Sequence, residues 1–129
     1  MKIRHHLLLT FAVCLILYPF TKILNLAALL AFGVLIDADH YFYYLLHFKK
    51  GNPLKALNYF TDIKDANHIL LVFHCIEWAI PLLVLALYFD IAWYALLGFI
   101  IHMVLDYIDS KLHADGRNLS FISWLVKNH

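Results

Sequence analysis

The amino-acid sequence predicts an all-α integral membrane protein, a bundle of about four transmembrane helices with short interfacial helices, forming one domain over residues 1–129. Hydrophobic residues make up 64% of the chain and charged residues only 15%, whereas soluble domains are about 45–50% apolar and 25% charged. The mean hydropathy is +0.74. Four apolar stretches, at 7–20, 23–36, 69–89 and 91–108, carry most of this hydrophobicity.

The first two apolar stretches are predicted to form a tight helical hairpin. Both are shorter than the roughly 20 residues that span a bilayer comfortably, and local thinning of the bilayer can accommodate them. Pro19 suits the turn between them. Basic residues precede the first stretch as in a signal peptide, but no A-x-A-like site follows it. We therefore expect a retained first membrane helix.

The third stretch, 69–89, is long enough to span a bilayer, and 91–108 nearly so. Between the second and third stretches, the Tyr-rich segment 41–48 favours the membrane–water interface. The alternative is one long helix over 23–48, which would place residues 37–40 in mid-membrane. A short surface helix is expected over 54–64, after the turn signal Asn52-Pro53, and a second interfacial segment over 119–126.

The distribution of basic residues predicts the orientation of this bundle. If all four stretches cross the membrane, nine of the ten Lys and Arg residues lie on the same side as both termini. Only Lys22 lies on the opposite side. Cytoplasmic loops carry an excess of Lys and Arg. We expect a multi-pass protein of the inner (plasma) membrane with both termini in the cytoplasm.

This topology gathers ionisable side chains from all four stretches at the cytoplasmic end of the bundle. Charge inside hydrocarbon is costly and marks a functional site. His102 and Asp106 are spaced i,i+4, and His74 and Glu77 are spaced i,i+3, so each pair would share one helix face. The predicted metal ligands are His6, Asp37, Asp39, His40, His68, His74, Glu77, His102 and Asp106.

The donor set predicts the metal. Carboxylate-bridged di-metal bundles use related carboxylate–histidine spacings. Mixed imidazole and carboxylate ligands suit divalent ions better than soft copper(I). We expect one to three bound ions of Zn²⁺, or alternatively of Mn²⁺ or Fe²⁺. His5, Asp109 and His113 are weaker candidates at the same end.

The motifs "HHLLL", "GVLIDADH", "NHILLVFHCIEW" and "GFIIHMVLDYID" occur in that order. This order resembles the small membrane-bound metal-dependent hydrolases, including the LexA-regulated inner-membrane type, which are distantly similar to zinc-dependent phospholipase C. Ile36 stands where that family usually has Pro, and the family's H-R-G-x-T-H-S motif is absent. The resemblance implies a metal-dependent hydrolase, with metal ligands at His6, Asp37, Asp39, His40, His74, His102 and Asp106.

We therefore expect a hydrolase, of phosphodiesterase type, that acts on a phosphoester of a membrane lipid or lipid-linked substrate. A divalent ion would lower the pKa of bound water toward about 7, with Asp39 or Glu77 as general base. A metal transporter or sensor, or a structural membrane module held by the ions, are the alternatives. The net charge of +1 excludes a nucleic-acid footprint, and no P-loop is present. A homo-oligomer is compatible with the sequence.

Overall fold

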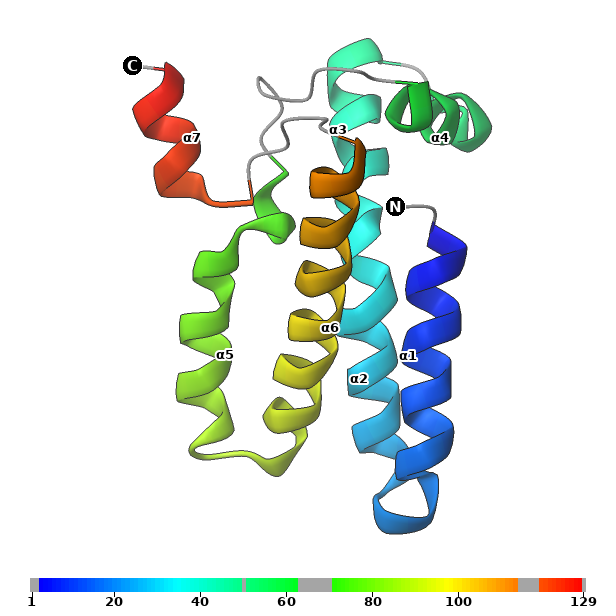
Figure 1. Cartoon of the computed structure of the whole chain (residues 1–129), viewed down its shortest axis with the longest axis vertical. Helices are drawn as coiled ribbons and strands as arrows, with labels where there is room; N and C mark the ends of the chain where they lie inside the picture. Colours follow the sequence, from blue (N-terminus) through cyan, green and yellow to red (C-terminus); the bar gives the residue numbers. More distant parts are fainter. Residues whose placement is uncertain (1–2, 50, 63–70, 114–118, 129) are drawn as a thin grey trace.

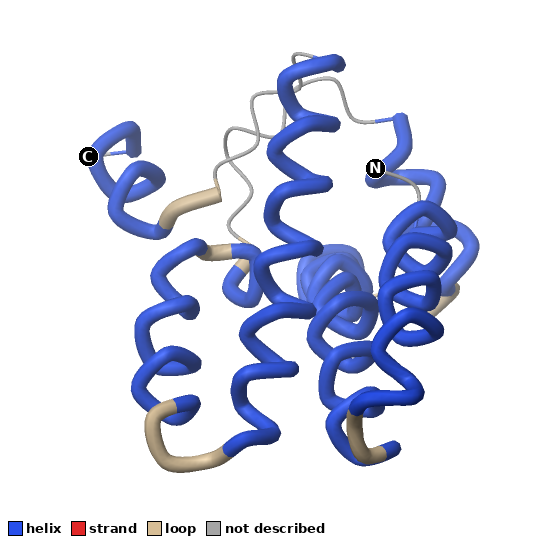
Figure 2. Tube along the Cα trace, turned by 60° about the horizontal axis from the view of Figure 1, so that its bottom comes forward, coloured by secondary structure: helices blue, strands red, loops and turns tan. Residues whose placement is uncertain are grey.

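The computed structural model describes residues 3–49, 51–62, 71–113 and 119–128. Every regular element in these ranges is helical (Figures 1 and 2), so the all-α prediction is confirmed for them. The elements are α1 (Ile3–Leu17), η1 (Tyr18–Phe20), α2 (Ile23–Val34), η2 (Leu35–Asp37), α3 (Ala38–Phe48), α4 (Pro53–Asp62), η3 (Val72–His74), η4 (Ile76–Trp78), α5 (Ala79–Ala86), α6 (Asp90–His113) and α7 (Phe121–Asn128).

The predicted hairpin of the first two stretches is confirmed. Helix α1 ends at Leu17, the 3-10 turn η1 contains Pro19, and α2 returns beside α1. Proline lacks a backbone N–H and stops α1 from continuing. Cys14, Leu26 and Leu29 form a buried core between the two helices.

Residues 23–48 form one nearly continuous helical rod, with α3 stacked on α2 through η2 (Figure 1). The favoured prediction ended the second helix before a separate segment, whereas residues 23–48 are helical throughout, as the long-helix alternative had it. Residues 34–40 contain no Pro or Gly, and Asp37 and Ala38 both keep right-handed helical angles. The rod ends instead at Lys49, whose φ of 51° is left-handed, a conformation typical of helix C-termini.

The third stretch is broken, although the sequence predicted it to be the best membrane span. Its described part holds two 3-10 turns, η3 and η4, and only the eight residues of α5 are α-helical. The chain is extended at Cys75 (φ −86°, ψ 125°), which separates η3 from η4, and Pro81 limits the N-terminal end of α5. Its ring is tolerated in the first turn of α5, but it would clash with the carbonyl of Glu77 in a helix that continued upstream.

Helix α6 is the longest element, with 24 residues, and it packs closely against α2. A Cβ atom at Gly98 would collide with the carbonyl oxygen of Leu29, and one at Gly33 with the side chain of Thr10. Small residues let helix backbones approach closely in this way. Beside this contact, Ile36, Phe99 and Met103 belong to one buried cluster.

Within the described ranges, two helices are long and apolar enough to cross a membrane, Ile23–Phe48 and Asp90–Leu112. The apolar helices α1 and α5 are shorter. Large hydrophobic side chains cover the outside of the bundle, with Ile16 69% and Leu46 78% exposed. Apolar surface on this scale exceeds what a soluble monomer leaves open to water.

Candidate metal centre

Side chains from five elements meet in one buried cluster of histidines and aspartates. Helix α1 contributes His6, and α6 contributes His102 and Asp106. The motif at the η2–α3 junction contributes Asp37, Asp39 and His40, and the end of η3 contributes His74. His6 and His102 are fully buried, and His74 and Asp106 are 1% exposed. Groups this polar are buried only where partners offset the cost.

His74 lies at the middle of the cluster, and its two ring nitrogens face different partners. Its Nε2 lies 3.0 Å from Nε2 of His102, 3.3 Å from Oδ2 of Asp106 and 3.4 Å from Oδ1 of Asp37. Its Nδ1 lies 3.0 Å from Oδ2 of Asp39. One ligand atom from each of Asp37, His74, His102 and Asp106 lies within 4.8 Å of the other three, and this set of four residues could hold a metal ion.

The partners at Nδ1 identify the donor nitrogen of His102 and place a carboxylate beside that of His74. His102 Nδ1 lies 3.2 Å from the carbonyl oxygen of Gly33, which can only accept, so this nitrogen is the donor. The ionised Asp39 carboxylate likewise accepts from His74 Nδ1. In the neutral rings both Nε2 atoms then carry lone pairs, and they face each other at 3.0 Å. Two lone pairs at this distance repel unless a proton or a metal cation lies between them.

The spacing of the donors fits a metal ion. Donor atoms at about 2.0–2.1 Å from a tetrahedral zinc ion lie roughly 3.3–3.4 Å from one another. His102 Nε2 lies 3.5 Å from Asp106 Oδ2 and 3.7 Å from Asp37 Oδ1, and the contacts of His74 Nε2 run from 3.0 to 3.4 Å. Most of these separations exceed the length of a good hydrogen bond. Among the residues that the structure describes, the buried Oδ2 of Asp37 has no hydrogen-bond partner.

Asp39 ties the η3 turn to α3. Its Oδ2 accepts hydrogen bonds from the backbone N–H of Phe73 and from His74 Nδ1, both at 3.0 Å. Its Oδ1 lies 3.2 Å from Nδ1 of His40. A second set of donors, from Asp39, His40 and His74, is also close enough to hold an ion. A carboxylate on the far nitrogen of a ligating histidine is the usual way of fixing its orientation.

His6 reaches the cluster from the other side of Asp106. Its Nε2 lies 3.2 Å from Oδ1 of Asp106, whereas the second carboxylate oxygen faces His74 and His102. The His6 ring stacks on His102 with the centroids 4.2 Å apart. Asp106 thus links the histidine of α1 to the two central histidines.

Glu77 lies apart from the cluster, against the N-terminus of α7. Its carboxylate accepts hydrogen bonds from Ser120 Oγ at 2.6 Å and from the backbone N–H groups of Phe121 and Ile122 at 3.1 Å. The prediction that His74 and Glu77 share a helix face is wrong, because the two residues belong to separate 3-10 turns. Partial burial raises the pKa of Glu77, but these hydrogen bonds lower it to about 2.

The remaining candidates fall outside the cluster or outside the described residues. His68 and the side chain of His113 are among the residues that are not described. His5 is exposed, and Asp109 is 7% exposed one turn beyond Asp106. Two partners that sequence analysis missed are the Gly33 carbonyl and the Phe73 N–H. Both are backbone groups, for which the sequence carries no signal.

No family model, curated protein or solved structure gives a match to this chain. The resemblance drawn from the sequence motifs therefore stays a hypothesis, and the functional argument rests on the geometry of the cluster.

Proposed function

We propose that the chain is a membrane-embedded, metal-dependent hydrolase that cleaves a phosphoester, and that Asp37, His74, His102 and Asp106 hold its divalent ion, most simply Zn²⁺. One observation carries the proposal. The Nδ1 atoms of His74 and His102 are occupied by acceptors, so both Nε2 lone pairs converge 3.0 Å apart beside two carboxylates. This donor set suits zinc, manganese or iron(II).

A divalent ion at this position supplies Lewis-acid activation of water and of a phosphoester oxygen. Asp39 orients His74 and is therefore a positioning residue, in place of the general base that the sequence suggested. His40 lies beside two of the carboxylates. Its Nδ1 lies 3.2 Å from Asp39 Oδ1 and 3.6 Å from Asp37 Oδ1. The His40 side chain is 18% exposed and that of Asp37 is 10% exposed, so solvent and substrate approach the cluster from this side.

The membrane setting favours a lipid-linked phosphoester as substrate. Two helices are long enough to span, and we propose that α1 and α5 complete a multi-pass bundle whose termini both face the cytoplasm. The basis is the excess of Lys and Arg on that side in the sequence. A headgroup would then meet the cluster while the acyl chains stay among the helices.

A structural metal site is the second candidate, and the donor count favours it. Four protein donors around one point would fill a tetrahedral ion, as in structural zinc sites, whereas catalytic sites keep a position open. The cluster also joins α1, the η2–α3 junction, η3 and α6. In the hydrolase, Asp37 is the donor that yields to substrate, because it is the most exposed of the four.

Metal analysis of detergent-purified protein tests the proposal first. Wild type should carry zinc or manganese in stoichiometric amount, and Asp106→Asn should lose it. Asp109→Asn is the matched control, because Asp109 is buried on the same helix and lies outside the four-donor set. Equal metal loss in both variants, or no metal in wild type after supplying zinc and manganese, would refute the metal centre.

The hydrolase is tested next with a water-soluble phosphodiester, bis(p-nitrophenyl) phosphate, and with phospholipid vesicles. Release of product by wild type, lost in Asp106→Asn and kept in Asp109→Asn, supports catalysis. A metal-loaded wild type that cleaves neither substrate and unfolds on chelation supports the structural site.

A further inference from the structure

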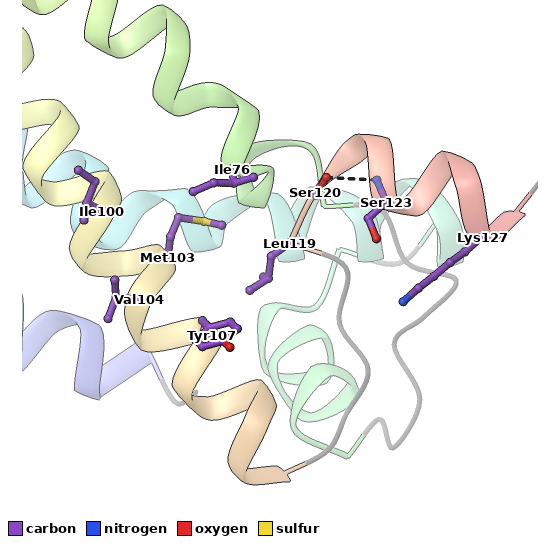
Figure 3. A pocket seen from close by; sticks show the side chains of 9 residues that line it. All are labelled: Ile76, Ile100, Met103, Val104, Tyr107, Leu119, Ser120, Ser123 and Lys127. Atoms are coloured by element: carbon purple, nitrogen blue, oxygen red, sulfur yellow. Dashed lines mark hydrogen bonds between the residues drawn. The ribbon is translucent and has the colours of Figure 1, made fainter.

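A groove of about 460 Å³ opens between α6, the η4 turn and α7 (Figure 3). Its volume lies within the range of about 300–1,000 Å³ that is typical of small-molecule sites. The residues that line it are Ile76, Ile100, Met103, Val104, Tyr107, Leu119, Ser120, Ser123 and Lys127.

The groove runs along the face of α6 next to the metal cluster. Ile100, Met103, Val104 and Tyr107 follow the i, i+3, i+4, i+7 spacing of one helix face. Met103 and Tyr107 directly follow the cluster residues His102 and Asp106 in the chain, and so lie about 100° further around the helix. The groove therefore flanks the candidate metal centre along α6.

The other wall of the groove comes from α7 and the two residues before it, and it carries the few polar groups of the lining. Ser120, Ser123 and Lys127 line this side (Figure 3). Two sets of hydrogen bonds hold α7 in place. Glu77 accepts from Ser120 and the first N–H groups of the helix, and Ile76 N–H donates to the carbonyl of Leu119 at 2.9 Å. The groove thus pairs a continuous apolar wall with hydroxyls and one cationic side chain.

We propose that this groove binds one acyl chain of an anionic membrane phospholipid, with the headgroup toward Lys127. The apolar stripe of α6 matches a hydrocarbon chain, and the positive charge of Lys127 complements a lipid phosphate. A peptide partner fits less well, because the α6 wall offers few partners for backbone amides. The proposal goes beyond the proposed function: it concerns a bound phospholipid whose phosphate faces Lys127, and not the phosphoester that would meet the metal cluster.

Photocrosslinking in nanodiscs tests the groove without relying on catalysis. The full chain is reconstituted in phosphatidylcholine containing a phosphatidylglycerol probe with a diazirine in its acyl chain, and labelled residues are mapped by mass spectrometry. Ile100 and Ile108 provide a matched pair. Both are isoleucines on α6, with 44% and 45% exposure, but only Ile100 lines the groove.

We expect labelling to concentrate on Met103 and Leu119 and to fall at least fivefold in Ile100→Trp, which fills the groove, while Ile108→Trp leaves it unchanged. A phosphatidylcholine probe should label the same residues more weakly. Labelling spread evenly over α6 and insensitive to Ile100→Trp would refute the acyl-chain site and indicate ordinary boundary lipid. Metal content and bis(p-nitrophenyl) phosphate hydrolysis of the same samples report separately on the proposed function.

Discussion

Asp39 of α3 bonds to η3 and Glu77 belongs to the adjoining η4, yet the two carboxylates serve different parts of the molecule. Asp39 is 6% exposed, and it orients His74 within the metal cluster. Glu77 binds the first N–H groups of α7 and lies outside the cluster. The comparison shows that each carboxylate of this apolar chain accepts hydrogen bonds from donors that the rest of the fold leaves unsatisfied. Here these donors are an imidazole N–H in one case and a helix N-terminus in the other.

The largest effect is expected from His102→Ala, which removes one of the two converging Nε2 atoms. Loss of an atom that binds the ion should abolish stoichiometric zinc binding. The stabilisation by added metal, which for a ligand at 100 times its Kd is about 2.7 kcal/mol, should disappear with it. Thermal unfolding with and without zinc measures this. Hydrogen exchange of α7 should not change. A variant that still gains the full thermal shift would show that the ion binds elsewhere.

A smaller effect is expected from Asp39→Asn, which keeps the shape of the side chain and removes its charge. Partners that orient a metal ligand typically contribute about 10–100-fold to metal affinity. We expect a loss of that size in zinc affinity, measured by competition with a chromophoric chelator. The visible spectrum of the cobalt(II) form should keep its shape, because the donor set is the same. A changed spectrum would mean that Asp39 is itself a ligand.

Glu77→Gln should weaken the docking of α7 and leave the metal cluster unchanged. A capping carboxylate at a helix N-terminus contributes about 1 kcal/mol, so amide hydrogen exchange in α7 should become roughly fivefold faster. Zinc affinity should equal that of wild type. Reduced metal affinity in this variant would restore Glu77 as a member of the metal site.

The smallest effect concerns acid. The pKa of Glu77 falls from the ordinary 4.5 to about 2 in the folded chain, so its carboxylate stabilises the docked α7 fully above pH 4.5. This contribution is lost as the pH falls through about 2, because the folded state then takes up the proton. Pepsin cleavage of α7 between pH 5 and pH 2 measures the loss, with Glu77→Gln as the reference. Parallel pH profiles for the two proteins would contradict the role of this carboxylate.

Local patterns in the sequence were enough for much of the fold. The apolar stretches and Pro19 predicted the helical hairpin, and the fourth stretch became α6. The i,i+4 spacing placed His102 and Asp106 together on a continuous helix, where the structure finds both in the cluster. Such inferences succeed because helix periodicity depends on residues only a few positions apart.

The third stretch shows where local patterns fail. Its hydropathy predicted a span, but Pro81 lies in the first turn of an α-helix that begins only at Ala79, and the extended Cys75 leaves His74 and Glu77 in separate turns. The proline was visible in the sequence. The direction that each side chain takes after the break was not, since no periodicity relates residues in successive irregular turns.

The sequence by itself determined an all-helical, strongly apolar chain with histidines and aspartates concentrated in a few motifs. Tertiary structure alone decided which of these groups meet and in what state. The acceptors that fix His74 and His102 lie 35 and 69 positions away in the chain, and one of them is the backbone carbonyl of Gly33. Such contacts exist only after α2, η3 and α6 have packed, because a hydrogen bond is directional and reaches about 3 Å.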